Sequence, residues 1–147
     1  MKGSKKTLGS KLLYFFRTPP EKRPTPYNSI YDRDFLKIPH IFPNEEIGLL
    51  IIVKSAEGNI KNRNIIRKTW GSKDYLQRNQ ISESAITQLY FICGRNSSNP
   101  ILLREESDLI IGDFMDTYKN LTYKSMMAFK FAVQLNFRYL LLVDDDM

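Results

Sequence analysis

The fold of this chain is decided by one apolar run, Ile47-Gly48-Leu49-Leu50-Ile51-Ile52-Val53. The run is short and rich in branched side chains, and its apolar residues do not alternate with polar ones. Such a run favours a strand that is buried on both faces, which is typical of a parallel sheet covered by helices. It therefore predicts a central strand of an α/β domain.

Downstream of this run, apolar segments alternate with segments of helical spacing. We predict further strands at 89–93 (closed by Gly94), 109–111 and 139–143. We predict helices at 57–70 (ending near Gly71), around 102–107 and at 120–136. The last helix is expected to bury an apolar face made of Leu121, Met126, Met127, Phe129 and Val133. This order indicates a mostly parallel sheet, in which ligands collect at the carboxyl ends of the strands.

Residues 1–44 have a different composition. Six of the seven prolines lie in residues 17–44, and proline neither continues a helix nor enters a central strand. Residues 1–23 carry seven basic side chains against one acid, which accounts for the whole net charge of +6. We interpret 1–44 as a disordered basic, proline-rich stem and 45–147 as the domain. Such an arm could touch anionic lipid or nucleic acid, but a solvated tail is the favoured interpretation, without a nucleic-acid partner.

The single cysteine and the short N-terminal apolar run exclude several structural classes. The only cysteine, Cys93, rules out an internal disulfide framework and a cysteine-rich zinc site. The longest apolar run near the N-terminus, Leu12–Phe16, is far shorter than the roughly 20 residues of a membrane span. It is also shorter than the apolar core of a signal peptide. Two alternatives remain, a soluble protein or a membrane anchor upstream of Met1.

Three consecutive carboxylates, Asp144-Asp145-Asp146, follow the last predicted strand. In an extended segment alternate side chains point the same way, so Asp144 and Asp146 are expected to converge while Asp145 faces elsewhere. Hard divalent cations prefer such oxygen ligands and complete their shell with substrate phosphates. The triplet predicts a metal and diphosphate site; the alternative is a solvated acidic terminus. A P-loop NTPase site is a weak alternative because no G-x-x-x-x-G-K-[ST] loop is present.

A basic cluster, Arg63-Asn64-Ile65-Ile66-Arg67-Lys68-Thr69-Trp70, follows the first strand. Arg63 and Arg67 are four residues apart and share one helical face, where their guanidinium groups could meet a phosphate. On these residues alone, the favoured interpretation is a solvated basic face with Trp70 packed in the core.

A third polar segment, 112–124, lies between a predicted strand and the last helix. We interpret Asn120 or Asp116 as a helix cap. Asn96-Ser97-Ser98 and Asn120-Leu121-Thr122 match the N-glycosylation acceptor pattern.

Taken in order, these segments resemble the β-1,3-galactosyltransferase family, glycosyltransferase family 31. The matching stretches are 63–70, Phe91-Ile92-Cys93-Gly94, 106–124 and 144–146, within a resemblance that runs from about residue 47 to the end. The resemblance implies a GT-A type nucleotide-sugar fold, Rossmann-like, with Mn²⁺ held by the aspartate triplet. It also implies a hexosyltransferase that moves galactose or an N-acetylhexosamine from UDP-galactose or a UDP-N-acetylhexosamine. The acceptor would be the 3-hydroxyl of a glycan on protein or lipid, and the anomeric centre would be inverted.

The resemblance also implies roles for individual residues. Asp146 would be the chief metal ligand. Asp144 would face the ribose or help to orient the metal, and Asp145 would lie near the sugar. Arg67, Asp113 and Lys124 would line the donor site.

Family members are type II membrane proteins of the Golgi, and their general base lies downstream of the triplet. We therefore expect this chain to be the N-terminal part of such an enzyme, with the anchor in the parent protein, and to be inactive by itself. The alternative is a non-catalytic remnant that acts as a binding or regulatory partner.

Overall fold

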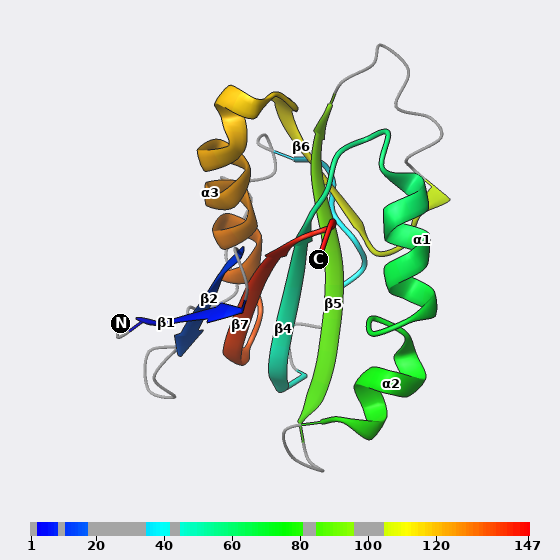
Figure 1. The fold of residues 1–147 in the computed structure, drawn as a ribbon, viewed down its shortest axis with the longest axis vertical. Coiled ribbons are helices and arrows are strands. Elements are labelled where there is room, and N and C mark those ends of the chain that lie inside the picture. Colours follow the sequence, from blue (N-terminus) through cyan, green and yellow to red (C-terminus); the bar gives the residue numbers. More distant parts are fainter. Residues whose placement is uncertain (1–2, 9–10, 18–34, 42–44, 81–84, 96–104) are drawn as a thin grey trace.

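The computed structural model describes residues 3–8, 11–17, 35–41, 45–80, 85–95 and 105–147 (Figure 1). Within these ranges the chain forms one seven-stranded sheet and three α-helices. The strands are β1 (Gly3–Leu8), β2 (Lys11–Arg17), β3 (Phe35–Lys37), β4 (Ile47–Lys54), β5 (Ile86–Arg95), β6 (Leu109–Met115) and β7 (Phe137–Asp144). The helices are α1 (Ile60–Lys68), α2 (Lys73–Arg78) and α3 (Leu121–Ala132), the last preceded by the 3₁₀ helix η4 (Tyr118–Asn120).

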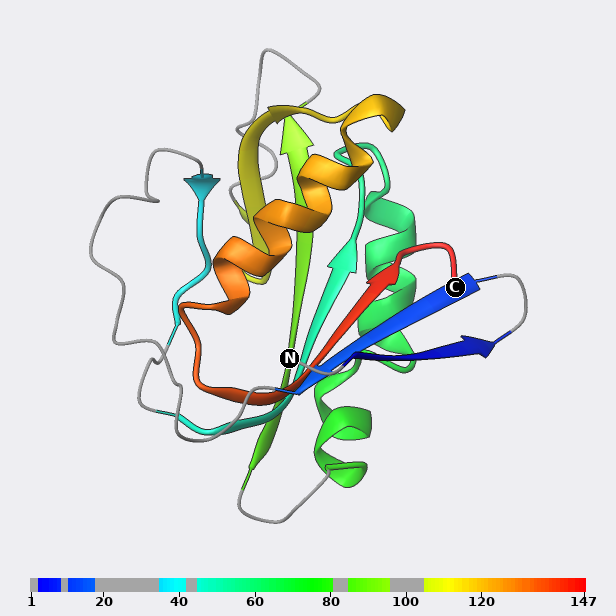
Figure 2. The same ribbon diagram turned by 90° about the vertical axis from the view of Figure 1, so that its left-hand side faces the viewer.

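The centre of the sheet is parallel. The strand order is β1-β2-β7-β4-β5-β6-β3, and β7, β4, β5 and β6 run in the same direction. From β4 the chain steps outward to β5 and β6, then returns through α3 to place β7 on the other side of β4 (Figure 2). Helices α1 and α2 lie on one face and α3 on the other (Figure 1). The prediction of a mostly parallel α/β sheet is confirmed.

The central strand β4 is buried on both faces. Leu50 and Ile52 belong to the core under α3, where they join Met127 and Phe131. Ile51 and Val53 face the opposite way and join the core under α1. The absence of alternation in this strand therefore has the predicted cause, because each face of the sheet is covered by helices.

The buried face of α3 differs from the predicted one. Met127 is buried, but Leu121, Met126 and Val133 are exposed. The helix instead buries a stripe at spacings of three and four residues, made of Lys124, Met127, Ala128, Phe131 and Ala132. The predicted face is therefore right for Met127 and for Phe129, which packs partly buried against the core, and wrong for the other three residues. The small alanines and the polar Lys124 were not counted in the apolar pattern.

Three strands lie within residues 1–44, the range that we interpret as a stem from composition. Strand β2 pairs antiparallel with β7, and β3 pairs antiparallel with β6. The edges of a parallel sheet present unpaired backbone groups that a short strand can satisfy, and the aromatic run in 12–16 has high strand propensity. Residues 18–34, which hold four of the prolines, lie outside the described residues.

Two further points concern helices, of which one is a difference from the prediction. Helix α2 was not predicted, although Ser72 caps it by accepting from the Tyr75 backbone N–H and Asp74 lies in its first turn. Most of the helix predicted around 102–107 lies outside the described residues.

In the part of the chain that the structure describes, the helices are too short or too polar to cross a membrane.

We predict that Gly94→Ala destabilises the sheet, because a Cβ at this position in β5 would lie 2.6 Å from the backbone oxygen of Phe114 in β6. A strand backbone cannot move away as a side chain can, so the expected loss is about 1–3 kcal/mol of unfolding free energy. Urea unfolding measures it.

The matched control is Gly58→Ala, whose Cβ would have no neighbour within 4 Å. It should change the unfolding free energy by less than about 0.5 kcal/mol. Equal losses for the two variants would contradict the close approach of β5 and β6.

Candidate functional site

The candidate site lies where β4 and β7 end side by side. Lys54 and Asp144 are paired in the parallel register, and the Asp145 backbone N–H donates to the Lys54 carbonyl at 3.1 Å. Successive connections leave β4 and enter β7 on opposite faces of the sheet, so this pair of strands forms the topological switch point. In open α/β sheets ligands bind at the carboxyl ends of the strands at such a point.

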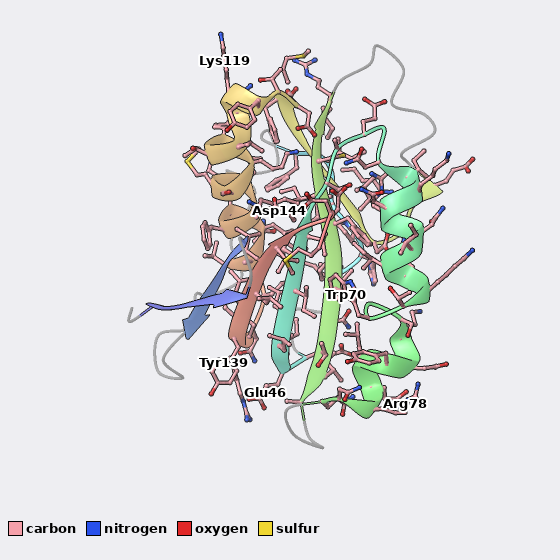
Figure 3. All side chains as sticks on the ribbon, in the orientation of Figure 1. Glu46, Trp70, Arg78, Lys119, Tyr139 and Asp144 are labelled. Atoms are coloured by element: carbon pink, nitrogen blue, oxygen red, sulfur yellow. The ribbon has the colours of Figure 1, made fainter. Side chains whose placement is uncertain are left out.

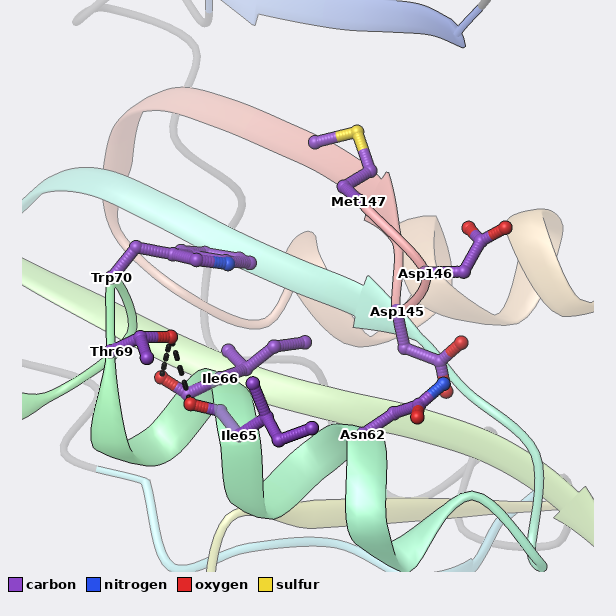
Figure 4. A pocket seen from close by; sticks show the side chains of 8 residues that line it. All are labelled: Asn62, Ile65, Ile66, Thr69, Trp70, Asp145, Asp146 and Met147. Atoms are coloured by element: carbon purple, nitrogen blue, oxygen red, sulfur yellow. Dashed lines mark hydrogen bonds between the residues drawn. The ribbon is translucent and has the colours of Figure 1, made fainter.

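The three aspartates of the triplet do not share one direction. Asp144 ends β7 and forms an ion pair with Lys54 at 3.1 Å (Figure 3). After Asp144 the chain enters a turn, so the alternation expected for an extended segment stops there. Asp145 points toward Asn62 on α1, whereas the exposed Asp146 points away from it (Figure 4). The expected convergence of Asp144 and Asp146 requires both residues to lie in an extended strand. That premise is wrong, since the strand ends at Asp144.

Asp145 is tied to the end of β4 and to the start of α1. Its Oδ2 accepts a hydrogen bond from Ser55 Oγ at 2.6 Å and another from Asn59 Nδ2 at 3.0 Å. Asn59 is the N-cap residue of α1, but its side chain makes no capping bond and is used for Asp145 instead. One carboxylate oxygen of Asp145 thus accepts two hydrogen bonds, both from residues outside the triplet.

Arg63 is completely buried on α1. Its guanidinium donates twice to Glu106, from Nε at 2.9 Å and from Nη2 at 2.8 Å. Nη1 donates to the Ala56 carbonyl at 2.6 Å and to Ser55 Oγ at 3.0 Å. A buried charge is stable only when it is paired and hydrogen-bonded. The interpretation of this cluster as a solvated basic face is therefore wrong for Arg63.

Arg67 shares the helical face of Arg63, as its spacing predicts. Its guanidinium binds Asp108 from Nε at 2.8 Å and from Nη2 at 2.6 Å, and Nη2 also meets Glu106 at 2.5 Å. It lies over the Phe91 ring, 4.8 Å from the centroid. The hydrogen bonds to Asp108 raise the pKa of Arg67. The predicted donor-binding residue Arg67 is thus held by two carboxylates and linked to Asp145 through Glu106, Arg63 and Ser55.

Lys124 lies buried on α3 and reaches the same end of β4 from the other face. Its Nζ forms an ion pair with Asp116 at 2.5 Å and donates to the Ser55 carbonyl at 2.6 Å. Asp116 also accepts from the Gly94 backbone N–H at 2.9 Å. Ser55 therefore contacts charged groups from both faces of the sheet.

The remaining predicted residues lie elsewhere. Asp113 is exposed on β6 and pairs with Arg95 at 3.2 Å, an exposed ion pair of small energetic value. Asp116 serves Lys124 and Asn120 Nδ2 donates to the Met115 carbonyl at 2.8 Å, with no side-chain cap on α3. Asn120 occupies the N-cap position of α3, as predicted, but its side chain makes no capping bond, and Asp116 is not the cap. The Asn96 pattern lies outside the described residues.

A pocket of about 330 Å³ opens between α1 and the turn that carries the triplet (Figure 4). We call it the α1 pocket. Trp70 flanks one end and packs partly against the core under α1, while Asp145 and Asp146 line the other end. Its lining residues are Asn62, Ile65, Ile66, Thr69, Trp70, Asp145, Asp146 and Met147. An aromatic and aliphatic wall that meets carboxylates suits a ligand with a flat apolar part and a charged part.

The carboxylate oxygens at this edge are ligands of the type that suits a divalent cation shared with a phosphate group. Across the described residues, no three His, Cys, Asp or Glu side chains cluster as a metal site made of protein ligands alone. Mg²⁺-like cations, however, commonly bind through one or two carboxylates and take substrate phosphate oxygens for the rest. Asp144, which is paired with Lys54, and the exposed Asp146 are carboxylates of the type that such a cation would need.

Sequence reasoning did not identify Ser55, Asn59 or Glu106 as individual functional residues. Glu106 was included in a matching stretch, but its partner Arg63 is 43 residues away in the chain. Ser55 and Asp145 are 90 residues apart. The only available signal for Ser55 was its position two residues after a predicted buried strand.

A family model described as Galactosyltransferase matches residues 61–147. The lactosylceramide 1,3-N-acetyl-beta-D-glucosaminyltransferase A of Danio rerio is 32% identical over 115 residues, which are 70% of this chain and 30% of that protein. The UDP-GalNAc:beta-1,3-N-acetylgalactosaminyltransferase 1 of Rattus norvegicus is 30% identical over 134 residues, which are 82% of this chain and 39% of that protein. The chain thus spans between about a third and two fifths of the length of these curated relatives.

We predict that Glu106→Gln destabilises the protein near neutral pH by about 3–5 kcal/mol, because Arg63 would keep a buried charge without its carboxylate. Burial alone would raise the pKa of Glu106, but the hydrogen bonds from Arg63 and Arg67 outweigh it and lower the pKa below 4.5. The charged carboxylate therefore contributes stability that is complete above pH 4.5 and is lost as the pH falls below it.

Urea unfolding between pH 7 and pH 3 measures this contribution. The difference between wild type and Glu106→Gln should shrink as the pH falls below 4.5. The exposed neighbour Glu105 provides the control, since Glu105→Gln should leave the unfolding free energy nearly unchanged. A pH-independent difference for Glu106→Gln would contradict the ion pair.

Proposed function

The chain belongs to the galactosyltransferase family, and from this premise we propose that it forms the nucleotide-sugar-binding part of a β-1,3-glycosyltransferase. One observation carries the proposal. The acidic triplet follows β7 at the switch point with β4, beside the α1 pocket. This is the edge of an α/β sheet at which nucleotides bind.

The proposed donor is UDP-galactose or a UDP-N-acetylhexosamine. The rat relative is named for UDP-GalNAc, and both relatives are named for 1,3-linked transfer of an N-acetylhexosamine. The Danio rerio relative is named for lactosylceramide, a glycolipid. We propose transfer with inversion to the 3-hydroxyl of an acceptor glycan on lipid or protein. We also propose a Golgi membrane location for the parent protein, which the same family membership supports.

In the proposed site, Asp144 and Asp146 would hold a divalent cation such as Mn²⁺. The cation, when bound, would supply Lewis-acid stabilisation of the charge that develops on the departing diphosphate. Trp70 would cover the flat face of the uracil ring, and the Asn62 amide in the same pocket can exchange hydrogen bonds with the nucleoside. Asp145, with one oxygen bound to Ser55 and Asn59, would hold the turn in place.

The arginines and the lysine of the motifs have an indirect part in this proposal. Arg63, Arg67 and Lys124 are each paired with a carboxylate of the protein. Their charge is therefore already compensated, and a diphosphate at this edge needs another countercharge. A cation on Asp144 and Asp146 would provide it, which supports metal-dependent binding over direct binding by arginine.

Trp70 is the only tryptophan of the chain, so its fluorescence reports on the α1 pocket alone. We predict that UDP changes this fluorescence in the presence of Mn²⁺. Asp146→Ala should weaken the binding at least tenfold, because the cation loses a carboxylate ligand. Asp74→Ala, which removes an exposed carboxylate of α2, should bind as wild type does.

Calorimetry of Mn²⁺ and UDP with the same three proteins measures the affinities independently. Identical affinity of wild type and Asp146→Ala would remove Asp146 from the site. A fluorescence change that does not depend on Mn²⁺ would contradict the proposed cation.

A further inference from the structure

We infer that Ser55 is a positioning residue for the acidic triplet: its hydroxyl holds Asp145, and Asp145 fixes the turn that carries Asp146. The inference rests on the proposed function and deepens it. It assigns a task to a residue that stands outside every motif recognised in the sequence.

The Ser55 hydroxyl lies between two opposite charges. Ser55 is only 3% exposed. Its Oγ donates to Asp145 Oδ2 at 2.6 Å and accepts from Arg63 Nη1 at 3.0 Å. A hydroxyl has one proton to donate and lone pairs to accept with, so both bonds can exist together. The charged donor polarises the hydroxyl and strengthens its bond to the carboxylate.

The backbone of Ser55 is held as firmly as its side chain. Its N–H donates to the Ile92 carbonyl at 2.9 Å, which keeps it in line with β5. Its carbonyl accepts from the buried Lys124 Nζ at 2.6 Å, which ties it to α3. Because Arg63 comes from α1, Ser55 is anchored to the sheet and to helices on both faces. A residue anchored in this way can set the position of a neighbouring group.

Asp145 has little freedom to serve as a cation ligand through the same oxygen. Its Oδ2 also accepts from Asn59 Nδ2 at 3.0 Å, and its backbone N–H donates to the Lys54 carbonyl. The oxygen is thus occupied by two donors. Asp145 is therefore the residue that holds the turn.

Holding a turn of this kind has a measurable consequence at a metal site. Partners that orient the ligands without touching the metal commonly change metal affinity by 10–100-fold when they are removed. Ser55→Ala removes one donor from Asp145 and one acceptor from Arg63, which retains Glu106 and the Ala56 carbonyl. The fold should therefore survive, while the turn loses its nearest support.

The experiment measures the dissociation constant of Mn²⁺ with UDP by Trp70 fluorescence and by calorimetry, using the full chain. We expect Ser55→Ala to weaken binding about tenfold. Ser55→Thr keeps the hydroxyl and should restore binding to within about threefold of wild type. The control is Ser125→Ala, which removes a hydroxyl that donates to the Leu121 carbonyl of its own helix α3 and should bind as wild type does.

A double-mutant cycle separates positioning from a general loss of stability. In an Asp145→Ala background the Ser55 hydroxyl has no carboxylate to hold, so Ser55→Ala should weaken binding no further. A purely structural role would give additive losses. Asn59→Ala removes the other donor to Asp145 and tests the same point if Ser55 variants do not fold.

The outcomes distinguish this inference from the proposed function. A wild-type chain that does not bind Mn²⁺ with UDP would overturn the proposed function, and the inference with it. Wild-type binding that Ser55→Ala and Asn59→Ala leave unchanged would overturn the inference alone. Additive losses in the double-mutant cycle would do the same.

Discussion

A guanidinium group without solvent exposure sets the constraint on which this end of the molecule depends. Arg63 is as buried as the surrounding apolar core, and its charge must be matched inside the protein. It is matched by Glu106, which precedes β6, and by oxygens of Ser55 and Ala56, which follow β4. The start of α1 is thereby fixed over the carboxyl edge of the sheet, beside the turn that carries Asp145.

The basic residues of the motif at 63–70 thus act on the protein more than on a ligand. Arg63 and Arg67 bind Glu106 between them, and Arg67 also binds Asp108. In the proposed function, the arginines of the protein bind its own acidic side chains, and a diphosphate is bound by a cation instead. The exposed carboxylates of Asp144 and Asp146 are then the groups that distinguish this edge from an ordinary strand end.

The sequence predicted those features of the fold and the site that a local residue pattern determines. The run at 47–53 shows a strand buried on both faces by its composition alone, and the triplet marks the edge of the sheet because it follows another such run. The pairing of Arg63 with Glu106 has no local pattern, since the partners are 43 residues apart. The sequence does not distinguish a buried arginine from a solvated one. The three consecutive aspartates likewise give no indication that the strand ends in a turn after Asp144. The role of Ser55 depends on Asp145 and Arg63 meeting at its hydroxyl and on Lys124 binding its carbonyl, which only the folded chain reveals.

The central claim is that the triplet and the α1 pocket form one site for a cation and a nucleotide. Paramagnetic broadening of NMR signals by Mn²⁺ in the presence of UDP tests it most directly, because broadening falls steeply with distance from the ion. If the triplet and the α1 pocket form this site, the amides of 144–147 and of Ser55 broaden first and the Trp70 indole signal shifts with UDP, while Asp113 and α2 are unaffected. Broadening centred on Asp113 and Arg95, or spread evenly over the acidic surface, would contradict it.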